Sequence, residues 1–598
     1  MKKFGYILAV TISFLAFNSC SNLYRQEAQT SMQASNIPAN SYGSYLAGRI
    51  AHYRQDFDAA AEYYMKTAQK DHSNPALLNK TYLMLASQGR ISEAAKFAKI
   101  AQNNGEKNEF ITVILAADSF KQNDYKSSLK EISKSTSPLY KKLISPFINA
   151  WSYAGLNQYD KAVAALSKIQ NEPGMETLYH FHTGMINDYF DKPEIARKHY
   201  EKIVTDKNLD LSVRTLEVIC NFYIRNGEKE KASAISGKFA KTVPPVVILQ
   251  NLDKQIKNAN PASTEALISS PQAGLSEAFF NISAIVKHNT EVLDLAHIFV
   301  RMAIYENPHN DLARILLANI LEMREMYKDA ISIYDEIKST STAYYIAQYK
   351  KAEDLRNLDD YKGSELLLKS LILDYPNDYQ SLLDLGDTLR IQEKYKEALK
   401  YYNQVIDQYK GIAGGMWQVY YALGITYERL GNWNKAEEML NKALELNPNN
   451  LLVLNYLGYS WLQQNKHQEK AFEYIVSAYN QAPYNSSIID SLGWAFYRLG
   501  MYDYAVTFLE KATDSEPSNA VINDHLGDAY WQSGRKNEAR FQWNHALTLK
   551  DDSGEINKKI LTDKVKNGMT NNIPLNYDKQ KIDTIISQIN TDGLSVKN

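Results

Sequence analysis

The chain has 598 residues, a formal net charge of −1 and only two cysteines. This length excludes a single compact core and requires either several domains or a stack of repeats that pack only on their neighbours. The balanced charge gives no electrostatic sign of nucleic-acid binding, which needs a basic face or stripe, and two cysteines exclude a disulfide framework or a zinc site.

Residues 1–20 have the layout of an export signal. Two lysines precede an apolar run from Gly5 to Phe17, which is short for a membrane-spanning helix. The segment resembles bacterial lipoprotein signal peptides, in which the cysteine at the position of Cys20 is acylated. The resemblance implies a lipid-anchored protein on the periplasmic side of the outer membrane, since Ser21 rather than Asp follows the cysteine.

Two residues before Cys20 depart from that pattern. Phe17 and Asn18 are poor fits to a lipoprotein signal, and Phe17 also fits an ordinary signal peptidase site poorly. Export as a soluble periplasmic protein and an uncleaved anchor therefore stay open as alternatives. Residues 21–40 are polar and contain Pro38, so we expect a flexible tether.

A 34-residue period runs through residues 41–242. Residues at one repeat position, which we call markers, are each followed twelve positions later by a small residue. The pairs are Gly48 with Ala60, Tyr82 with Ala94, Ala116 with Ser128, Ala150 with Ala162, Gly184 with Ala196 and, after a longer step, Cys220 with Ala232. Each pair alone is weak evidence, but six pairs in phase predict an N-terminal array of helix pairs.

The period breaks once, between Cys220 and the next marker, Ala284, which is 64 residues away. The gap contains four prolines, in "KTVPPVVILQ" and "NPASTEALISSPQAG". We interpret residues 243–273 as a helix followed by a proline-rich joint between two arrays. The alternative is a degenerate repeat with no mechanical role.

Residues 274–550 return to the period and form a predicted C-terminal array. The later markers with their small partners are Ala284 with Ala296, Ala318 with Ala330, Ala352 with Ser364, Gly386 with Ala398, Gly424 with Ala436, Gly458 with Ala471, Gly493 with Ala505 and Gly527 with Ala539. Marker and partner must be small so that two antiparallel helices can approach closely. Pro448, Pro483 and Pro517 then end second helices, because proline lacks an N–H and clashes with the preceding turn.

These small, large and proline positions resemble the tetratricopeptide repeat family, whose unit is a 34-residue helix pair. The resemblance covers most of residues 41–550 and is most specific in the last four units. It implies an all-α superhelix of about fourteen repeats, in which the first helices line a concave side. Residues 551–568 are expected to form a polar capping helix, and residues 569–598 a mostly disordered tail with a short helix at "QKIDTIISQI".

The sequence contains no motif of a catalytic, cofactor or metal site. It lacks a phosphate-binding loop, "HExxH" and "GxSxG", and its eleven histidines are scattered. His180 and His182 lie on different faces of a helix, and Cys220 lies in an apolar helical stretch, so we assign all three structural roles. We expect no enzyme activity and no cofactor.

The resemblance places a partner-binding groove on the first helices of the last four units. The side chains three before and one, four or five after the markers point into it: Tyr421, Arg429, Asn455, Tyr459, Asp490, Trp494, Tyr497, Arg498, Asp524, Asp528 and Trp531. Aromatic residues beside Arg and Asp are the composition that recognition surfaces favour. The alternative for each tryptophan is that it only completes packing between repeats.

The sequence thus predicts a non-enzymatic scaffold that binds proteins or peptides for assembly, secretion or envelope maintenance, tethered to the membrane through an N-terminal lipid. An accessory subunit of an envelope enzyme, such as a glycosyltransferase or a peptidase, is the alternative. A cytoplasmic scaffold remains only if the N-terminus is neither cleaved nor lipidated.

Overall fold

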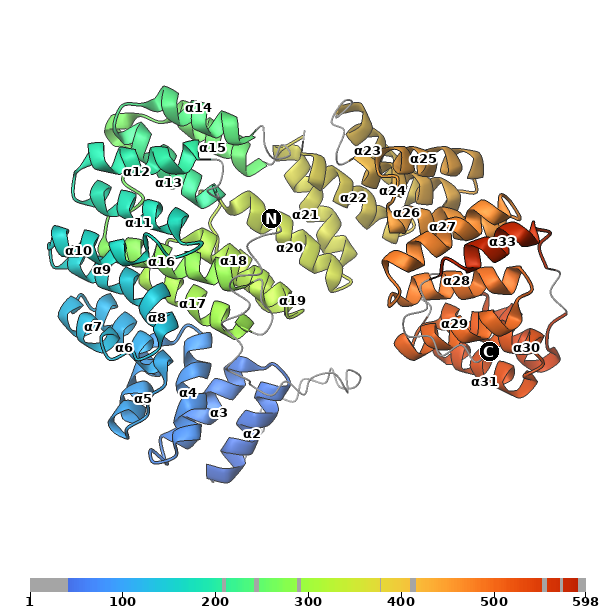
Figure 1. Ribbon diagram of the computed structural model, residues 1–598, viewed down its shortest axis with the longest axis horizontal. Coiled ribbons are helices and arrows are strands. Elements are labelled where there is room, and N and C mark those ends of the chain that lie inside the picture. Colours follow the sequence, from blue (N-terminus) through green and yellow to red (C-terminus); the bar gives the residue numbers. More distant parts are fainter. Residues whose placement is uncertain are drawn as a thin grey trace. The chain divides into compact units, whose positions relative to one another are not determined.

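The computed structural model describes residues 41–206, 211–240, 247–287, 292–376, 378–408, 416–550, 556–570 and 574–589. These residues form two compact units, which divide between Asp378 and Tyr379. The predicted signal and tether, including Cys20, lie outside the described residues. Every regular element in the described ranges is helical, which confirms the predicted all-α class (Figure 1).

Unit 1 contains nine antiparallel helix pairs among its described residues. They are α2 (Ser41–Tyr53) with α3 (Phe57–Ala68), α4 (Pro75–Ser87) with α5 (Ile91–Asn103), α6 (Glu109–Lys121) with α7 (Tyr125–Ile132), α9 (Ser145–Gly155) with α10 (Tyr159–Leu166), α11 (Glu176–Tyr189) with α12 (Pro193–Thr205), α13 (Val213–Arg225) with α14 (Lys229–Ala240), α16 (Pro271–Val286) with α17 (Leu293–Glu306), α18 (Asp311–Glu322) with α19 (Tyr327–Asp335), and α20 (Tyr344–Asn357) with α21 (Tyr361–Asp374). Helices α8 (Pro138–Leu143) and α15 (Val247–Asn258) are additional to the pairs.

Unit 2 contains five further pairs in the part of the chain that is described. They are α22 (Tyr379–Ile391) with α23 (Tyr395–Gln408), α24 (Met416–Arg429) with α25 (Trp433–Leu446), α26 (Leu451–Gln463) with α27 (Gln468–Gln481), α28 (Ser486–Arg498) with α29 (Tyr502–Ser515), and α30 (Ala520–Gln532) with α31 (Lys536–Thr548). Two more helices follow, α32 (Lys558–Asn567) and α33 (Lys579–Ile586). The pairs in the two units together match the predicted number of about fourteen.

The small residues of the repeat have the steric role that the sequence predicts. All fourteen small partners on the second helices, from Ala60 to Ala539, have no exposed surface. A Cβ on the marker Gly493 would lie 2.6 Å from Cγ of Leu509, and one on Gly424 would lie 2.6 Å from Cγ of Leu440. The marker glycine therefore leaves room for a large side chain that lies one turn beyond the small partner on the second helix. This contact lets the two helices of the pair pack closely.

The proline-rich segment lies within unit 1 and not between the two units. The helix expected in residues 243–273 is α15, whose apolar side chains Leu249, Leu252 and Ile256 are buried. Helix α15 packs on α13, α14 and α20, so it is part of one compact body. The chain instead divides between α21 and α22, at a position where the repeat period does not break.

Helices α16 and α17 fold back on the first helices of unit 1. Helix α16 packs against α9 and α11, and α17 packs against α4 and α6, so this pair lies on the inner side of the curve of those helices (Figure 1). Arg301 donates to the carbonyl of Ser87 at 3.0 Å, and Lys121 donates to the carbonyl of Glu306 at 2.9 Å. The inner side of the N-terminal repeats is thus filled by the chain itself.

The C-terminal segment also packs on the repeats. Helix α32 packs against α31, in the segment predicted to form a capping helix. Residues 574–589 of the predicted tail pack on the repeats of unit 2, and α33, which falls on the short helix expected at "QKIDTIISQI", packs on α27. The physical reason is the spacing of apolar residues: Ile582 has no exposed surface, and Leu575, Ile585 and Ile586 pack against the same core.

Candidate protein-binding surface

The predicted groove residues lie on the first helices of four successive pairs in unit 2. Helix α24 carries Tyr421 and Arg429, α26 carries Asn455 and Tyr459, α28 carries Asp490, Trp494, Tyr497 and Arg498, and α30 carries Asp524, Asp528 and Trp531. Their exposure differs along the array. Five of them, Asp490, Trp494, Tyr497, Asp528 and Trp531, are buried, five are half-buried, and Arg429 is exposed.

Trp494 is held between two other rings and does not face solvent. Its ring stacks on Tyr497 at 4.6 Å and on His525 of the next repeat at 4.1 Å, and only 9% of the residue is exposed. Asp490 lies 2.9 Å from Nδ1 of His525. This tryptophan therefore completes the contact between α28 and α30, as the alternative interpretation of the sequence proposed.

His525 is a residue that the sequence analysis missed. Burial opposes its charge, but the carboxylates of Asp490, Asp524 and Asp528 together outweigh burial and raise the pKa of His525 above its ordinary value of 6.5. The signal was present in the sequence, because His525 lies two residues before the marker Gly527 on a face shared with the groove positions. A buried His–Asp pair at this position stabilises the stacking of two repeats.

Trp531 is covered by the C-terminal segment of the chain. Its Nε1 donates to the carbonyl of Met569 at 2.8 Å, and a Cβ on Gly568 would overlap its ring. Gly568 has a φ of 74°, a conformation that favours glycine, so the chain turns at this residue directly over the indole. Trp531 is consequently unavailable to a partner while this segment is in place.

Lys564 of α32 neutralises the two carboxylates beside Trp531. Its Nζ lies 2.8 Å from Oδ1 of Asp524 and 2.8 Å from Oδ1 of Asp528, and Nε1 of Trp543 donates to the same Asp528 oxygen at 2.9 Å. Burial and the neighbouring Asp524 raise the pKa of Asp528 to about 6, although Lys564 opposes that rise. These acidic groups thus bind the chain's own capping helix.

The C-terminal segment then continues across two further repeats. The N–H of Leu575 donates to the carbonyl of Arg498 at 2.9 Å, and Pro574 lies on Gly500. The N–H of Asp578 donates to Glu469 at 3.0 Å, where α27 begins. The segment therefore connects the pairs α26–α27, α28–α29 and α30–α31, and the sequence contained no periodic signal for it.

The remaining predicted residues form a surface that stays partly accessible. We define the α24–α28 surface as Tyr421, Arg429, Asn455, Tyr459 and Arg498. Gln463 connects two of them, since it donates to the hydroxyl of Tyr459 at 2.8 Å and accepts from Arg498 at 3.3 Å. The Oδ1 atom of Asn455 is buried and has no hydrogen-bond partner. Tyrosine rings and arginine guanidinium groups are enriched among the residues that dominate binding between proteins.

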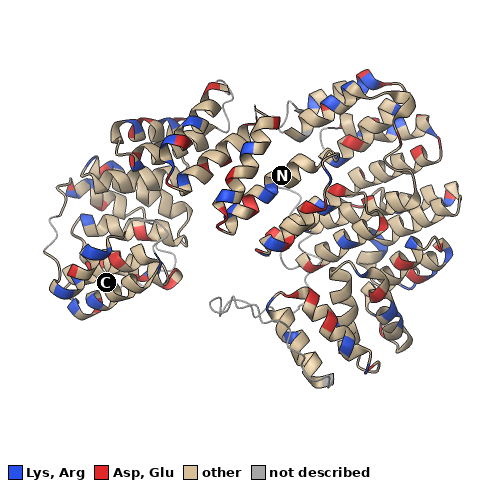
Figure 2. Cartoon of the chain, turned by 180° about the vertical axis from the view of Figure 1, so that it is seen from behind, with Lys and Arg blue, Asp and Glu red and all other residues tan. Residues whose placement is uncertain are grey.

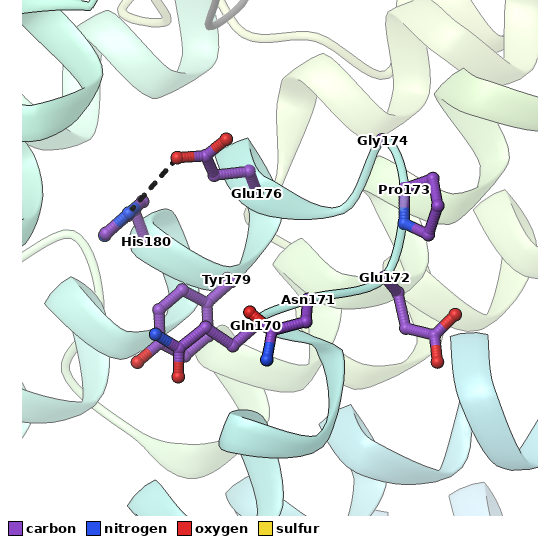
Figure 3. Close-up of a pocket in the computed structure, with 8 residues that line it drawn as sticks. All are labelled: Gln170, Asn171, Glu172, Pro173, Gly174, Glu176, Tyr179 and His180. Carbon is purple, nitrogen blue, oxygen red and sulfur yellow. Dashed lines mark ion pairs between the residues drawn. The ribbon is translucent and has the colours of Figure 1, made fainter.

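Two cavities of the described residues lie elsewhere, in unit 1. The larger, of about 410 Å³, lies where residues 170–174 lead into α11 and is lined mainly by polar side chains (Figure 3). His180 lies on its wall, 4.0 Å from Glu176, and its Nδ1 is 2.9 Å from Nδ1 of His199. Burial lowers the pKa of both histidines, which favours their neutral forms.

The smaller cavity, of about 260 Å³, lies beside α13 and includes Cys220. Burial raises the pKa of the Cys220 thiol to about 12, which leaves it protonated and unreactive. Arg214 on its wall is paired with Glu217 and Glu277 at 3.1 and 2.6 Å. The ion pair of Arg214 with Glu277 joins α13 to α16. We therefore assign the charged groups on the wall of this cavity a structural role.

Charge and metal-ligand distribution point to no other kind of site in the described ranges. Lysines and arginines alternate with acidic residues along both units (Figure 2). The described residues contain no cluster of three or more His, Cys, Asp or Glu side chains arranged to hold a metal ion. They also contain no helix that is both long and apolar enough to cross a bilayer.

Comparison with known proteins identifies the repeat. Two family models of the tetratricopeptide repeat match residues 378–449 and 421–486, which are the residues of α22 to α27. The helix pairs on both sides of this range have the same spacing and the same buried small residues. Residues 378–486 therefore consist of tetratricopeptide repeats, as the sequence pattern indicated, and the helix pairs on both sides continue the same architecture.

Individual relatives are similar over part of their length only. The chain is 25% identical to BBSome complex member BBS4 of Bos taurus over 31% of this chain and 35% of that protein. It is 29% identical to the TPR repeat-containing protein PA4667 of Pseudomonas aeruginosa over 22% of this chain and 23% of that protein. It thus spans about a third or less of these curated relatives.

Among solved structures, the anaphase-promoting complex hetero-tetramer Cut9–Hcn1 covers 89% of this chain and 97% of its own, with 13% identity and a TM-score of 0.38.

Proposed function

We propose that this tetratricopeptide-repeat protein is a non-enzymatic scaffold of the bacterial envelope, which binds partner proteins on the α24–α28 surface. Repeats of this family serve as protein-interaction modules, and their first helices supply the binding residues. The sequence contains no phosphate-binding loop, "HExxH" or "GxSxG" motif, and Arg214 on the wall of the smaller cavity is paired with Glu217 and Glu277.

One observation carries the proposal. Other segments of the chain cover the first helices to a different extent in the two units. In unit 1, helices α16 and α17 pack on the first helices. In unit 2, the C-terminal segment covers Trp531 and the carboxylates of α30 but leaves Tyr421, Arg429 and Tyr459 partly accessible. A partner protein consequently finds aromatic and cationic side chains on α24 to α28.

The partner surface is tested by affinity purification with single substitutions. Tyr459→Ala and Arg429→Ala remove an aromatic ring and a cation from the α24–α28 surface, and each is expected to lower partner recovery about tenfold or more if the residue anchors the partner. Neither residue is buried, so the fold is expected to be unaffected. Co-purified proteins are quantified by mass spectrometry after expression in a Gram-negative host.

The control is Phe541→Ala, because Phe541 is an aromatic residue on a second helix that is 68% exposed. This variant is expected to recover the same partners as the wild type. Equal recovery by all three variants contradicts the assignment of the surface.

The envelope location is tested separately at the N-terminus. If Cys20 is acylated, the mature chain begins at Cys20 and carries the mass of its acyl chains, because lipoprotein processing removes residues 1–19. The measurement is mass spectrometry of the N-terminal peptide from membrane fractions, with Cys20→Ser as the control that must abolish the modification. An unmodified peptide that begins at Met1 would contradict the tether.

A further inference from the structure

Helix α2 carries a stripe of large apolar side chains that face away from the rest of unit 1. Tyr42, Leu46, Ile50 and Tyr53 are 84%, 56%, 53% and 70% exposed. Because an α-helix turns by 100° per residue, these positions lie within about 80° of one another on a single face. The opposite face contains Gly48, which packs against Tyr64 of α3.

The stripe differs from other exposed apolar residues of unit 1. Single exposed hydrophobic side chains are normal on protein surfaces, whereas a contiguous stripe marks a surface that is covered in use. The next first helix, α4, has α3 of the preceding pair packed against it, whereas α2 is the first helix of the described residues. Helix α2 therefore lies at the end of the described helices of unit 1 (Figure 1), and the stripe is on its exposed side.

Basic residues accompany the stripe. Arg49 lies beside Tyr42 and Tyr53 on the helix surface, Arg54 follows the last helical residue, and both are exposed. Residues 41–53 contain no Asp or Glu. Tyrosine with Leu and Ile on one face, bordered by arginine, is the composition of helices that lie in the interface of a phospholipid bilayer.

We propose that α2 lies on the surface of a phospholipid bilayer, with the rings of Tyr42 and Tyr53 among the headgroups and Leu46 and Ile50 below them. The proposal rests on the proposed function in one respect, which is the predicted anchor at Cys20. The 20 residues between Cys20 and Ser41 reach at most about 70 Å, so an anchored chain keeps α2 at a high local concentration near lipid. A modest intrinsic affinity of α2 is then sufficient.

The experiment uses the chain from Ser21 to Asn598, which contains every described residue and has no acyl group. Its binding is measured by co-sedimentation with vesicles of phosphatidylcholine and phosphatidylglycerol, and with vesicles of phosphatidylcholine alone. We expect binding that is stronger on the anionic vesicles and that falls about tenfold or more in the double variant Leu46→Glu, Ile50→Glu. The matched control is Leu366→Glu, Leu373→Glu, which changes two leucines on α21 that are 62% and 84% exposed.

A second measurement reports the position of α2 directly. Cys220 is only 1% exposed, so a cysteine introduced by Tyr53→Cys is the reactive site for an environment-sensitive fluorophore, and Phe541→Cys provides the control position. The label at residue 53 is expected to shift to shorter wavelength on the anionic vesicles, and the label at residue 541 is not.

Three outcomes overturn the proposal. They are absence of vesicle binding by the unaltered chain, equal binding by the Leu46→Glu, Ile50→Glu variant, and a dimer in light scattering that this variant abolishes. The last outcome assigns the stripe to a second copy of the chain. Because the chain under test has no acyl group, none of these results depends on lipidation or on the α24–α28 surface.

Discussion

Replacing Trp151 by alanine is expected to destabilise unit 1 by about 3–5 kcal/mol, the range for removal of a large aromatic side chain from a packed core. Trp151 has no exposed surface and lies on α9, where its ring packs against Gly274 of α16. Its Nε1 also donates to Nδ1 of His182 at 3.3 Å. The substitution therefore removes one of the contacts that hold α16 on the N-terminal repeats, and chemical denaturation followed by circular dichroism measures the loss.

The same contact can be tested from its other side with a matched pair of glycines. A Cβ on Gly274 would overlap the Trp151 ring, whereas one on Gly237 of α14 would meet no atom within 4 Å. Gly274→Ala is thus expected to destabilise by about 1–3 kcal/mol through overpacking. Gly237→Ala is expected to be neutral or to stabilise by up to about 1 kcal/mol, since alanine is the better helix former. Equal stability of the two variants would contradict the placement of α16.

Replacing Lys564 by methionine is expected to destabilise unit 2 by about 3–5 kcal/mol near neutral pH, because it leaves the buried carboxylate of Asp528 and the half-buried carboxylate of Asp524 without a counter-charge. The side chains of Lys564, Asp524 and Asp528 are 15%, 20% and 6% exposed, so water replaces the lost ammonium group poorly. The measurement is urea unfolding of the variant and the wild type. The control is Lys579→Met, which removes a lysine whose side chain is 79% exposed.

The effect of Lys564→Met depends on pH in a defined direction. Burial and Asp524 raise the pKa of Asp528 to about 6 in the folded wild type, above its ordinary value of 3.8. A raised folded pKa means that the folded state binds more protons than the unfolded state, so stability from Asp528 is lost as pH rises through this range. Removal of Lys564 raises the pKa of Asp528 further.

The difference between wild type and variant is accordingly expected to be small below the ordinary pKa of Asp528 and largest above about pH 7. Adding Asp528→Asn to Lys564→Met removes one of the two like charges and is expected to restore part of the stability. A variant with the same loss at all pH values would show that Lys564 acts through packing alone.

The repeats could be predicted from the sequence because their spacing is short-range and periodic. Gly424 and Ala436 lie twelve residues apart in one helix pair, and the pattern recurs in each unit. The contact of Trp151 with Gly274 has no such signal, since it joins residues 123 positions apart and occurs once. Periodicity specifies which helices pair, whereas it does not specify how a stack folds back on itself.

The candidate surface was predicted in part for the same reason. The repeat pattern placed all eleven predicted groove residues on first helices. In the structure Tyr459 lies on the first helix α26 and Trp531 on the first helix α30. The burial of Trp531 depends on Gly568, and that of Trp494 on His525 in the next repeat. Accessibility is set by neighbouring segments, so the position of a residue within its own repeat cannot determine it.

Site-specific photo-crosslinking in living cells tests the central claim most directly. A photoreactive amino acid is placed at Tyr459, on the α24–α28 surface, and in a separate variant at Phe541, on a second helix. The account predicts discrete crosslinked complexes with the same partner proteins from position 459 and none from position 541. Crosslinks from position 541 alone, or an equal pattern from both positions, would contradict it.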